Sequence, residues 1–435
     1  MVKIIGCDCG KDSLYVCVVD KAPRDFKSFS RSYKPKILKI SHEAIDWLIE
    51  ENADCYVLEP TGSYSYIWVD QLKKHGKDVR LVSPRRITAY RSYKGVNNKK
   101  DKEDAAAIAV YALENYFNSS AFIGIEQMEL KEHFLALKNT INNRNPMINR
   151  LCQRLCYEVP EIVNTVEDSG RSWLNPKPPA ILRFIAGEPD NPEDRHRKKR
   201  QEKVDNTIGR GISDHSKLLA EQICHLHKVE YPLEIKVDNI LSDEKFAKYS
   251  KVFDEFLMGP KTRLSLTCAI YPFESFLEDG KEIVEFISST DKSKNKRTRR
   301  NRSEGAFKLS LGMGLIFKES GTKKGWVKGG PKHARATLWT YVTTTILMNR
   351  KMKTANADIQ TAVATLGNPK VSHWLNTELI KAIAALTDTT EEVAALRLHY
   401  MYLRPNEASF KRRSATASRL TRRMYKLLAK EFVQK

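Results

Sequence analysis

The chain has 435 residues, 41% of them hydrophobic, which is enough for two or three domains with apolar cores. Its 74 lysines and arginines outnumber its 53 aspartates and glutamates, and the net charge of +21 favours nucleic acid as a polyanionic partner. Apolar runs such as 339–348 are too short and polar to span a bilayer, and no signal peptide precedes the first strand pattern. We therefore expect a cytoplasmic protein without a membrane partner.

The first 120 residues alternate strand and helix after an opening hairpin, an order typical of an α/β fold. The hairpin is expected within 2–20, with a polar turn at Gly10. Further strands are expected at 36–40, 55–58 and 79–82, and helices at 42–51, 66–75 and 101–117.

A helical arm is predicted next. Apolar residues at helical spacing over 126–160 predict a long helix, broken near Pro146, as part of a helical hairpin or coiled coil. The many prolines and charges of 168–215 indicate a loop-rich, partly ordered insertion, and helical spacing returns at 217–228.

From about residue 243 the pattern is mostly helical, with a helix expected at 334–352 and a helical tail at 378–435. The glycine- and lysine-rich stretch 319–332 is expected to be a loop. Gly259 and the residues after it fit either a backbone phosphate contact or a helix stop. These changes divide the chain into predicted domains 1–120, 121–242 and 243–435.

The eight cysteines contain no CxxC pair, so free thiols in a reducing cytosol are the favoured interpretation. Cys152 and Cys156 lie one helical turn apart, and Cys224 is near His227. A zinc site from these residues is conceivable but lacks the paired spacing of such sites.

Four acids stand at the ends of predicted elements. Asp8 interrupts an apolar strand, Glu59 ends another strand, and Asp101 and Asp104 share one face at a helix start. Asp101 and Asp104 also suit ordinary first-turn acids that complement the helix dipole. If all four converge on the sheet, they form an oxygen ligand set for Mg²⁺ or Mn²⁺, which supports phosphoryl transfer.

Three segments around these acids resemble the blocks of DEDD transposases, the insertion sequence 110 family related to the Piv and MooV invertases. They are Asp8–Lys11, Glu59–Tyr64 and Lys99–Ala105, and Val82–Arg86 matches a stretch between the last two blocks. Lys100 stands where the family usually has threonine. The resemblance implies a RuvC-like (RNase H-like) N-terminal domain in which the four acids bind divalent metal.

A second motif, Glu319–Gly321 followed by Lys328–Arg335, resembles the mostly helical C-terminal transposase domain of the same family. There a serine before a glycine is the nucleophile, which implies this role for Ser320. Lys328, Gly330 and Arg335 match the family pattern, whereas Pro331 replaces the usual asparagine. From the residues alone, Ser320 also fits a surface loop with a solvated basic face.

Dense basic runs at 195–200, 292–302 and 411–413 favour phosphate contacts over scattered surface charge. The candidate nucleic-acid-binding residues are Lys11, Arg85, Arg86, Arg297, Arg299, Arg300, Lys323, Lys324, Lys328 and Arg335. Aromatic residues such as Tyr90, Tyr93 and Trp326 could stack on unpaired bases, whereas core packing is favoured for Trp339.

The leading hypothesis is a serine recombinase that cuts and rejoins DNA of a mobile element. The resemblance further implies double-stranded donor and target DNA, a structured bridge RNA as guide, a homodimer or homotetramer, and a prokaryotic cytoplasm. One alternative is a metal-dependent nuclease that acts on branched DNA with water as the nucleophile. The other is a non-catalytic nucleic-acid-binding protein with structural acids.

Overall fold

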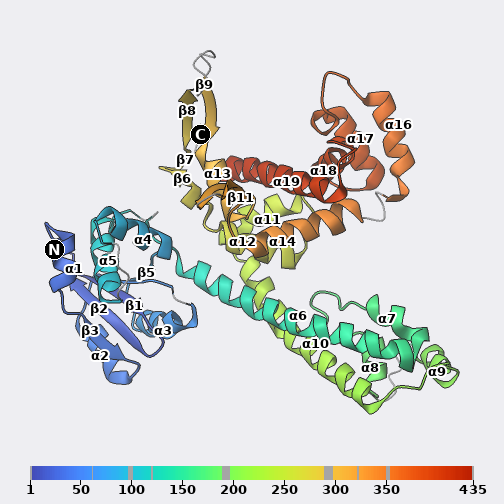
Figure 1. Cartoon of the computed structure of the whole chain (residues 1–435), viewed down its shortest axis with the longest axis horizontal. Coiled ribbons are helices and arrows are strands. Elements are labelled where there is room, and N and C mark those ends of the chain that lie inside the picture. Colours follow the sequence, from blue (N-terminus) through green and yellow to red (C-terminus); the bar gives the residue numbers. More distant parts are fainter. Residues whose placement is uncertain are drawn as a thin grey trace. The chain divides into compact units, whose positions relative to one another are not determined.

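The computed structural model describes residues 2–60, 62–96, 101–118, 121–188, 196–288, 297–320, 323–348 and 353–433. The chain forms two compact units, Met1–Glu129 and Leu130–Lys435 (Figure 1). The three-domain division of the sequence stays a prediction. Within the described ranges, no helix is long and apolar enough to cross a membrane.

The first unit is built on a mixed five-stranded sheet in the order β3-β2-β1-β4-β5. Strands β1, β2 and β3 are antiparallel neighbours, whereas β1, β4 and β5 run parallel. All five strands predicted in this region are confirmed. Their bounds are β1 Ile4–Cys9, β2 Ser13–Val19, β3 Lys36–Lys39, β4 Cys55–Leu58 and β5 Val79–Leu81.

Helices cover both faces of this sheet, because alternate residues of its strands belong to two separate apolar cores. One core contains α2 and α3, and the other contains residues of α1, α4 and α5. The sequence patterns predicted α2, α3 and α5 and missed the short α1 and α4. The bounds are α1 Phe26–Ser32, α2 His42–Glu50, α3 Tyr66–Lys74, α4 Pro84–Tyr93 and α5 Asp101–Glu114.

Helix α5 lies directly on β1, and small residues permit this approach. A Cβ atom at Gly6 would stand only 2.3 Å from the backbone nitrogen of Ala109. The alanine-rich sequence of α5 is buried over most of its length. This packing fixes α5 against the strand that carries Asp8.

The second unit begins within α6 (Ile125–Glu158), which forms an arm of two long antiparallel helices with α10 (Asp214–Leu241) (Figure 1). The break predicted near Pro146 is wrong, since α6 continues through that residue. Proline removes one backbone hydrogen bond of the helix, but a contact with the neighbouring helix α10 stabilises this turn. Arg144 forms a buried ion pair with Glu230 of α10 at 2.7 Å.

The stretch 168–215 is more ordered than expected. It contains α8 (Ala180–Ile185) and α9 (Arg197–Asp205), although 189–195 lie outside the described residues. The apolar side chains of α8 pack with Leu151, Leu155 and Leu219 of the long helices. Burial of this apolar face, which the prolines obscured, stabilises the end of the arm.

The rest of the second unit is a helical body with a large shared core and a smaller core around α16, α17 and α18. Gly259 is the N-cap of a helix rather than a stop. The principal helices are α11 Ala247–Asp254, α12 Pro260–Ile270, α13 Arg302–Ser310, α14 Lys332–Tyr341, α16 Asn356–Leu366, α17 Thr377–Thr387, α18 Glu391–Tyr402 and α19 Ser409–Phe432.

Among the described residues, three antiparallel hairpins interrupt this body, so its C-terminal part is less uniformly helical than predicted. The loop expected at 319–332 is wrong, because strands β10 and β11 occupy most of it. Of the helix expected at 334–352, the part to Tyr341 is α-helical and Val342–Leu347 is π-helical, whereas 349–352 lie outside the described residues. The strands are β6 Leu277–Glu278, β7 Lys281–Glu282, β8 Val284–Ser288, β9 Arg297–Asn301, β10 Leu315–Ser320 and β11 Lys323–Lys328.

Candidate functional site

Asp8 and Glu59 stand side by side at one edge of the sheet. The parallel register pairs Cys7 of β1 with Leu58 of β4, and the Glu59 amide donates to the Cys7 carbonyl at 3.4 Å. Neighbouring strands lie about 4.8 Å apart, so the two acids occupy adjacent positions at the same level.

Both acids also belong to the sheet face that α5 covers. Ile4 of β1 and Val57 of β4 pack into the core that contains α5, whereas Ile5 and Leu58 pack into the opposite core. Because side chains alternate along a strand, Asp8 and the residue after β4 continue the α5-facing series.

The direction of α5 brings its first turn toward the same edge. Arg80, the middle residue of β5, donates to the Tyr116 carbonyl, just beyond α5, at 2.6 Å. The carboxyl end of α5 therefore lies near the amino ends of the parallel strands. Ala109 of α5 lies against Gly6 of β1. Asp104 precedes Ala109 by about 7.5 Å along the helix, and Asp8 follows Gly6 by two residues, a similar distance, along the strand. Asp104 and Asp8 therefore lie at similar distances from this contact.

Within that first turn the two predicted acids differ sharply. Asp101 is exposed, whereas Asp104 is 4% exposed and forms an ion pair with Arg91 of α4 at 2.7 Å. Glu103 is also buried, and its Oε2 accepts no hydrogen bond from the part of the chain that the structure describes. The sequence reasoning missed both Arg91 and Glu103, although Glu103 lies between the two predicted acids.

The carboxylates suit a hard divalent cation in ligand type, and binding at Asp104 would compete with Arg91. Among the described residues, no group of three or more histidine, cysteine, aspartate or glutamate side chains is arranged to hold a metal ion. Cys7 is no substitute ligand, since burial, followed by the charges of Cys9, Cys17 and Asp8, raises the pKa of its thiol. The metal-binding role of the four acids therefore stays a prediction.

The conceivable zinc residues of the arm are not assembled into a site. Cys156 is exposed, whereas Cys152 and Cys224 are buried in the apolar core of the arm. Burial raises the pKa of the Cys224 thiol to about 12, which disfavours the thiolate that zinc requires.

Ser320 is the last residue of β10, opposite Lys323 in the β10–β11 register. The backbone thus places the candidate nucleophile at the far end of a hairpin rather than in an extended loop. The side chains of Ser320, Arg85, Lys323 and Lys324 lie outside the described part of the chain, as does Gly321 as a whole.

The base of this hairpin explains two residues of the second motif. Gly330 has φ +81°, and a Cβ there would lie 1.8 Å from the Leu309 carbonyl oxygen. Arg335 donates from Nη1 to the Gly312 carbonyl at 2.9 Å. Both residues therefore hold the hairpin on the helical body, and for Arg335 this contact is an alternative to a phosphate. Lys328 donates to Ser414 of α19 at 2.6 Å.

Arg299 and Arg300 line a basic groove of about 1060 Å³ between β9, α13 and α19. Lys426 and Lys430, exposed on α19, lie in the same lining. Their spacing from Arg422, four and eight residues, is the helical signal that could have identified them.

Two glutamates in this groove already have ion-pair or hydrogen-bond partners. Glu304 pairs with Lys308 at 2.5 Å and with Arg422 at 2.9 Å, and although burial opposes the effect, these contacts lower the pKa of Glu304. Glu282 accepts from Tyr425 at 2.7 Å. The exposed arginines and lysines thus give the groove the character of a polyanion site.

The other predicted basic residues are dispersed. Lys11 is exposed in the β1–β2 turn, Arg86 is half-buried in α4, and Arg297 is exposed on β9. Arg412 donates to the Tyr400 carbonyl, at 2.9 Å from Nη2, and lies over the Tyr400 ring. Part of the 411–413 run therefore stabilises the fold, while Arg413 packs over Trp339.

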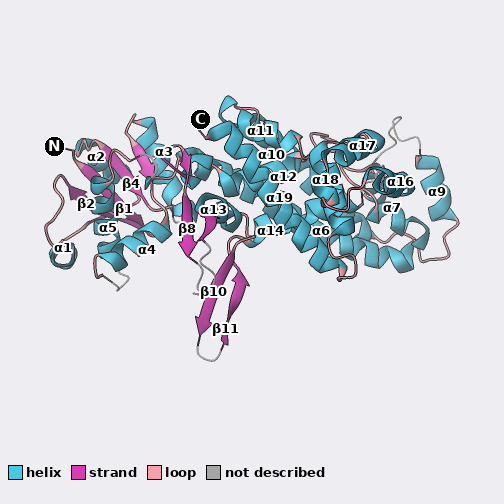
Figure 2. Cartoon of the chain, turned by 90° about the horizontal axis from the view of Figure 1, so that it is seen from above, coloured by secondary structure: helices cyan, strands magenta, loops and turns pink. Residues whose placement is uncertain are grey.

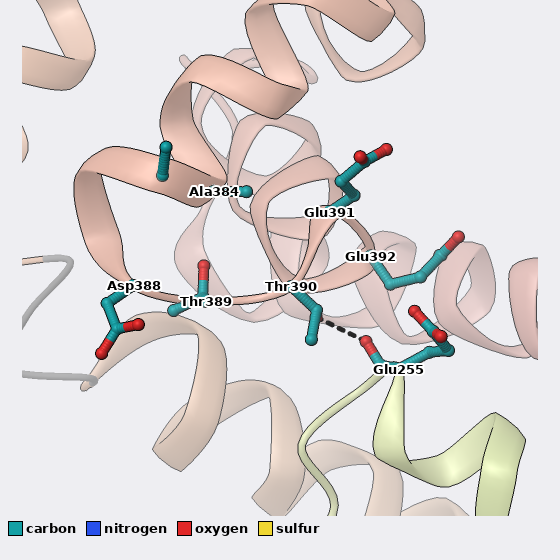
Figure 3. Close-up of a pocket in the computed structure, with 8 residues that line it drawn as sticks. Glu255, Ala384, Asp388, Thr389, Thr390, Glu391 and Glu392 are labelled. Atoms are coloured by element: carbon teal, nitrogen blue, oxygen red, sulfur yellow. Dashed lines mark hydrogen bonds between the residues drawn. The ribbon is translucent and has the colours of Figure 1, made fainter.

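A separate hollow between α11 and the α17–α18 turn is acidic (Figure 3). Asp388, Glu391 and Glu392 line it, and Thr390 donates to the Glu255 carbonyl. Arg423 satisfies Glu392, donating from Nη2 at 2.8 Å. Its charge makes this hollow a poor site for a phosphate backbone.

Comparison with known proteins gives one family result. A family model described as "Transposase", for DEDD transposases of insertion sequence 110, matches residues 5–160. No curated protein matches the chain. One similar solved structure is "T. thermophilus RuvC in complex with Holliday junction substrate", with 14% identity over 28% of this chain and all of that chain, at a TM-score of 0.21. The segment that carries Asp8, Glu59, Asp101 and Asp104 is therefore similar to a transposase family and supports a DNA-cutting and rejoining enzyme.

Proposed function

We propose that this chain is a cytoplasmic DNA transposase that cuts and rejoins the DNA of a mobile element. The observation that carries the proposal is the placement of Asp8 and Glu59 at one level of the α5-facing sheet edge, toward which α5 brings its first turn. The transposase match over residues 5–160 covers this arrangement and supports it.

Asp8, Glu59, Asp101 and Asp104 would hold Mg²⁺ or Mn²⁺. When bound, such a cation neutralises charge on the phosphate and assists deprotonation of the nucleophile. The exposed Asp101 leaves that end of the set open to solvent, where a DNA strand can approach. Metal binding by Asp104 would compete with its ion pair to Arg91.

Ser320 is the proposed nucleophile. Its Oγ would form an ester bond with phosphorus, while a bridging oxygen of the DNA leaves and takes up a proton. A hydroxyl of the exchanged strand then displaces the serine, so strands are rejoined without net hydrolysis. Lysines near Ser320 in the sequence provide positive charge for the phosphate.

The basic groove supports a nucleic-acid partner in addition to the strand being cut. We assign double-stranded donor and target DNA as substrates, a structured bridge RNA as guide, and a homodimer or homotetramer as the active form. Sequencing the RNA that co-purifies with the protein tests the guide directly, and its absence would remove the guided mechanism.

A cleavage assay with Mg²⁺ and labelled DNA from around the coding sequence of this chain tests the chemistry. Ser320→Ala should remove a covalent protein–DNA adduct that survives denaturing gels, and Asp101→Asn should stop strand cleavage. Ser275→Ala and Asp46→Asn, both at exposed positions, are the matched controls.

The outcomes separate the three candidate functions. Cleavage by Ser320→Ala without any adduct would instead establish a metal-dependent nuclease that uses water. Full activity of both Ser320→Ala and Asp101→Asn would leave only a nucleic-acid-binding role.

A further inference from the structure

The β10–β11 hairpin exposes large apolar side chains to solvent, which is unfavourable for a hairpin without a binding partner. Figure 2 shows it projecting from the helical body of the second unit. Leu315 is 62% exposed, Phe317 49% and Trp326 65%. An isolated two-stranded hairpin is at best marginally stable in water, so this surface is suited to a partner.

The exposed aromatic residues form a defined pair on one face. Phe317 and Trp326 are directly opposed in the register, and their ring centroids lie 5.4 Å apart in an edge-to-face arrangement. Ser320 ends β10 three residues after Phe317, about 10 Å further along the strand. The aromatic pair and the candidate nucleophile thus belong to one ribbon, three register positions apart.

The hairpin is presented on a rigid base. The left-handed backbone of Gly312 and Gly330 and their close contacts leave no room for a side chain at either position. The hydrogen bond from Arg335 to the Gly312 carbonyl stabilises the same base of the hairpin. A ribbon fixed in this way can position aromatic rings against a ligand with little loss of entropy on binding.

The positive charge of the hairpin favours a negatively charged partner. Residues 315–328 contain four lysines and one glutamate, a net charge of +3. Two copies of the ribbon would repel each other, whereas a phosphate backbone would be attracted. Aromatic rings beside positive charge are the combination by which proteins bind unpaired bases, since every base has a face for stacking.

We propose that Phe317 and Trp326 stack on locally unpaired DNA bases beside the phosphodiester that the hairpin end engages. This inference rests on the proposed function, because it takes DNA as the substrate, and it adds that the substrate is opened before it is cut. The hairpin is a strand-separating element whose aromatic face holds unpaired bases.

Fluorescence anisotropy with the full chain tests this inference on two probes, a paired DNA duplex and the same duplex with a short mismatched bubble. Wild-type protein should prefer the bubble. Trp326→Ala and Phe317→Ala should each weaken bubble binding by about 5- to 100-fold, with little change for the paired duplex. Trp326→Phe should retain most of the preference.

Phe410→Ala removes a similarly exposed aromatic residue of α19 and should leave the preference unchanged. Equal losses on both probes, or an unchanged preference in Trp326→Ala, would overturn the inference. So would a change of oligomeric mass in Trp326→Ala with intact DNA binding, because the surface would then be a protein interface. Tighter binding to the matching RNA strand than to the bubble would assign the rings to RNA instead.

The binding assay repeated with Ser320→Ala protein separates this inference from the proposed chemistry. A bubble preference that persists there supports the aromatic site whatever the nucleophile. Binding to the duplex without preference would remove only the inference. Binding to neither probe would overturn both the inference and the proposed function.

Discussion

Buried acids occur in both units, and the two units neutralise them differently. In the arm, Glu230 and Glu234 are fully buried among three cations, Arg144, Arg171 and Lys261. At the sheet edge, Asp104 pairs with Arg91, while Asp101, one turn earlier on α5, is exposed.

The buried acids of the arm and the candidate catalytic acids of the sheet differ in how their charge is balanced. Three cations surround the two acids of the arm network, and His227 beside it accepts a hydrogen bond from Arg144 at 3.2 Å. At the sheet edge, the acids come from strand ends and a helix start, and Asp101 of the helix pair is exposed. Similar residue types thus serve packing in one unit and are proposed to serve metal-assisted chemistry in the other.

The largest effect on stability is expected in the arm. Glu230→Ala would leave Arg144 and Arg171 buried with one acid fewer, and should lower the free energy of unfolding by about 3–5 kcal/mol. Urea denaturation measures the loss. Glu221→Ala, at an exposed position of the same helix, should cost less than about 0.5 kcal/mol. Equal losses for both variants would show that the network is not a stabilising element.

Arg91→Met tests metal binding at the sheet edge by removing the cation that pairs with Asp104. It should lower the free energy of unfolding by about 3 kcal/mol without metal, because Asp104 loses a buried partner. Mg²⁺ should then recover more stability in this variant than in wild-type protein. Lys94→Met breaks the partly exposed pair with Glu114 on the same helices and serves as the control. If Mg²⁺ stabilises neither protein, the metal assignment fails.

The exposed cations of the groove should influence binding more than stability. Arg299→Ala with Arg300→Ala should weaken duplex DNA binding by about tenfold and reduce the salt dependence by about one phosphate contact per residue. Affinities measured over a series of salt concentrations give this slope. Arg404→Ala, which removes an exposed arginine outside the groove, should leave the slope unchanged. An unchanged slope in the double variant would remove the groove from the nucleic-acid surface.

The smallest expected effect is a pH dependence of the arm. Burial, followed by the charges of Arg144, Arg171 and Lys261, lowers the pKa of His227 to about 3. The unfolded chain binds this proton near pH 6.5, so stability is complete above that value and falls as the pH decreases toward 3. At pH 5.5 the loss is about 1.4 kcal/mol, and His227→Gln should remove this component from thermal denaturation curves. Parallel curves for both proteins would contradict the assignment.

Much of the first unit could be predicted from the sequence because its signals are local. Apolar runs such as 55–58 define strands directly, and the acids stand at the ends of those runs. Helix α4 was missed because its sequence is polar and basic, and its single fully buried apolar residue, Ile87, is recognised only after the sheet is formed. Composition alone also misjudged 168–215, where the apolar face of α8 is stabilised by the long helices.

The candidate sites divide in the same way. The sequence by itself determined the four acids, the serine motif and the basic character of β9, since these depend on residue type and short spacing. Only the tertiary structure decided that Asp104 pairs with Arg91, that β10 and β11 form a ribbon, and that Arg422 meets Glu304. The last pair is 118 residues apart in the chain, and such contacts arise from packing of whole elements rather than from any local pattern.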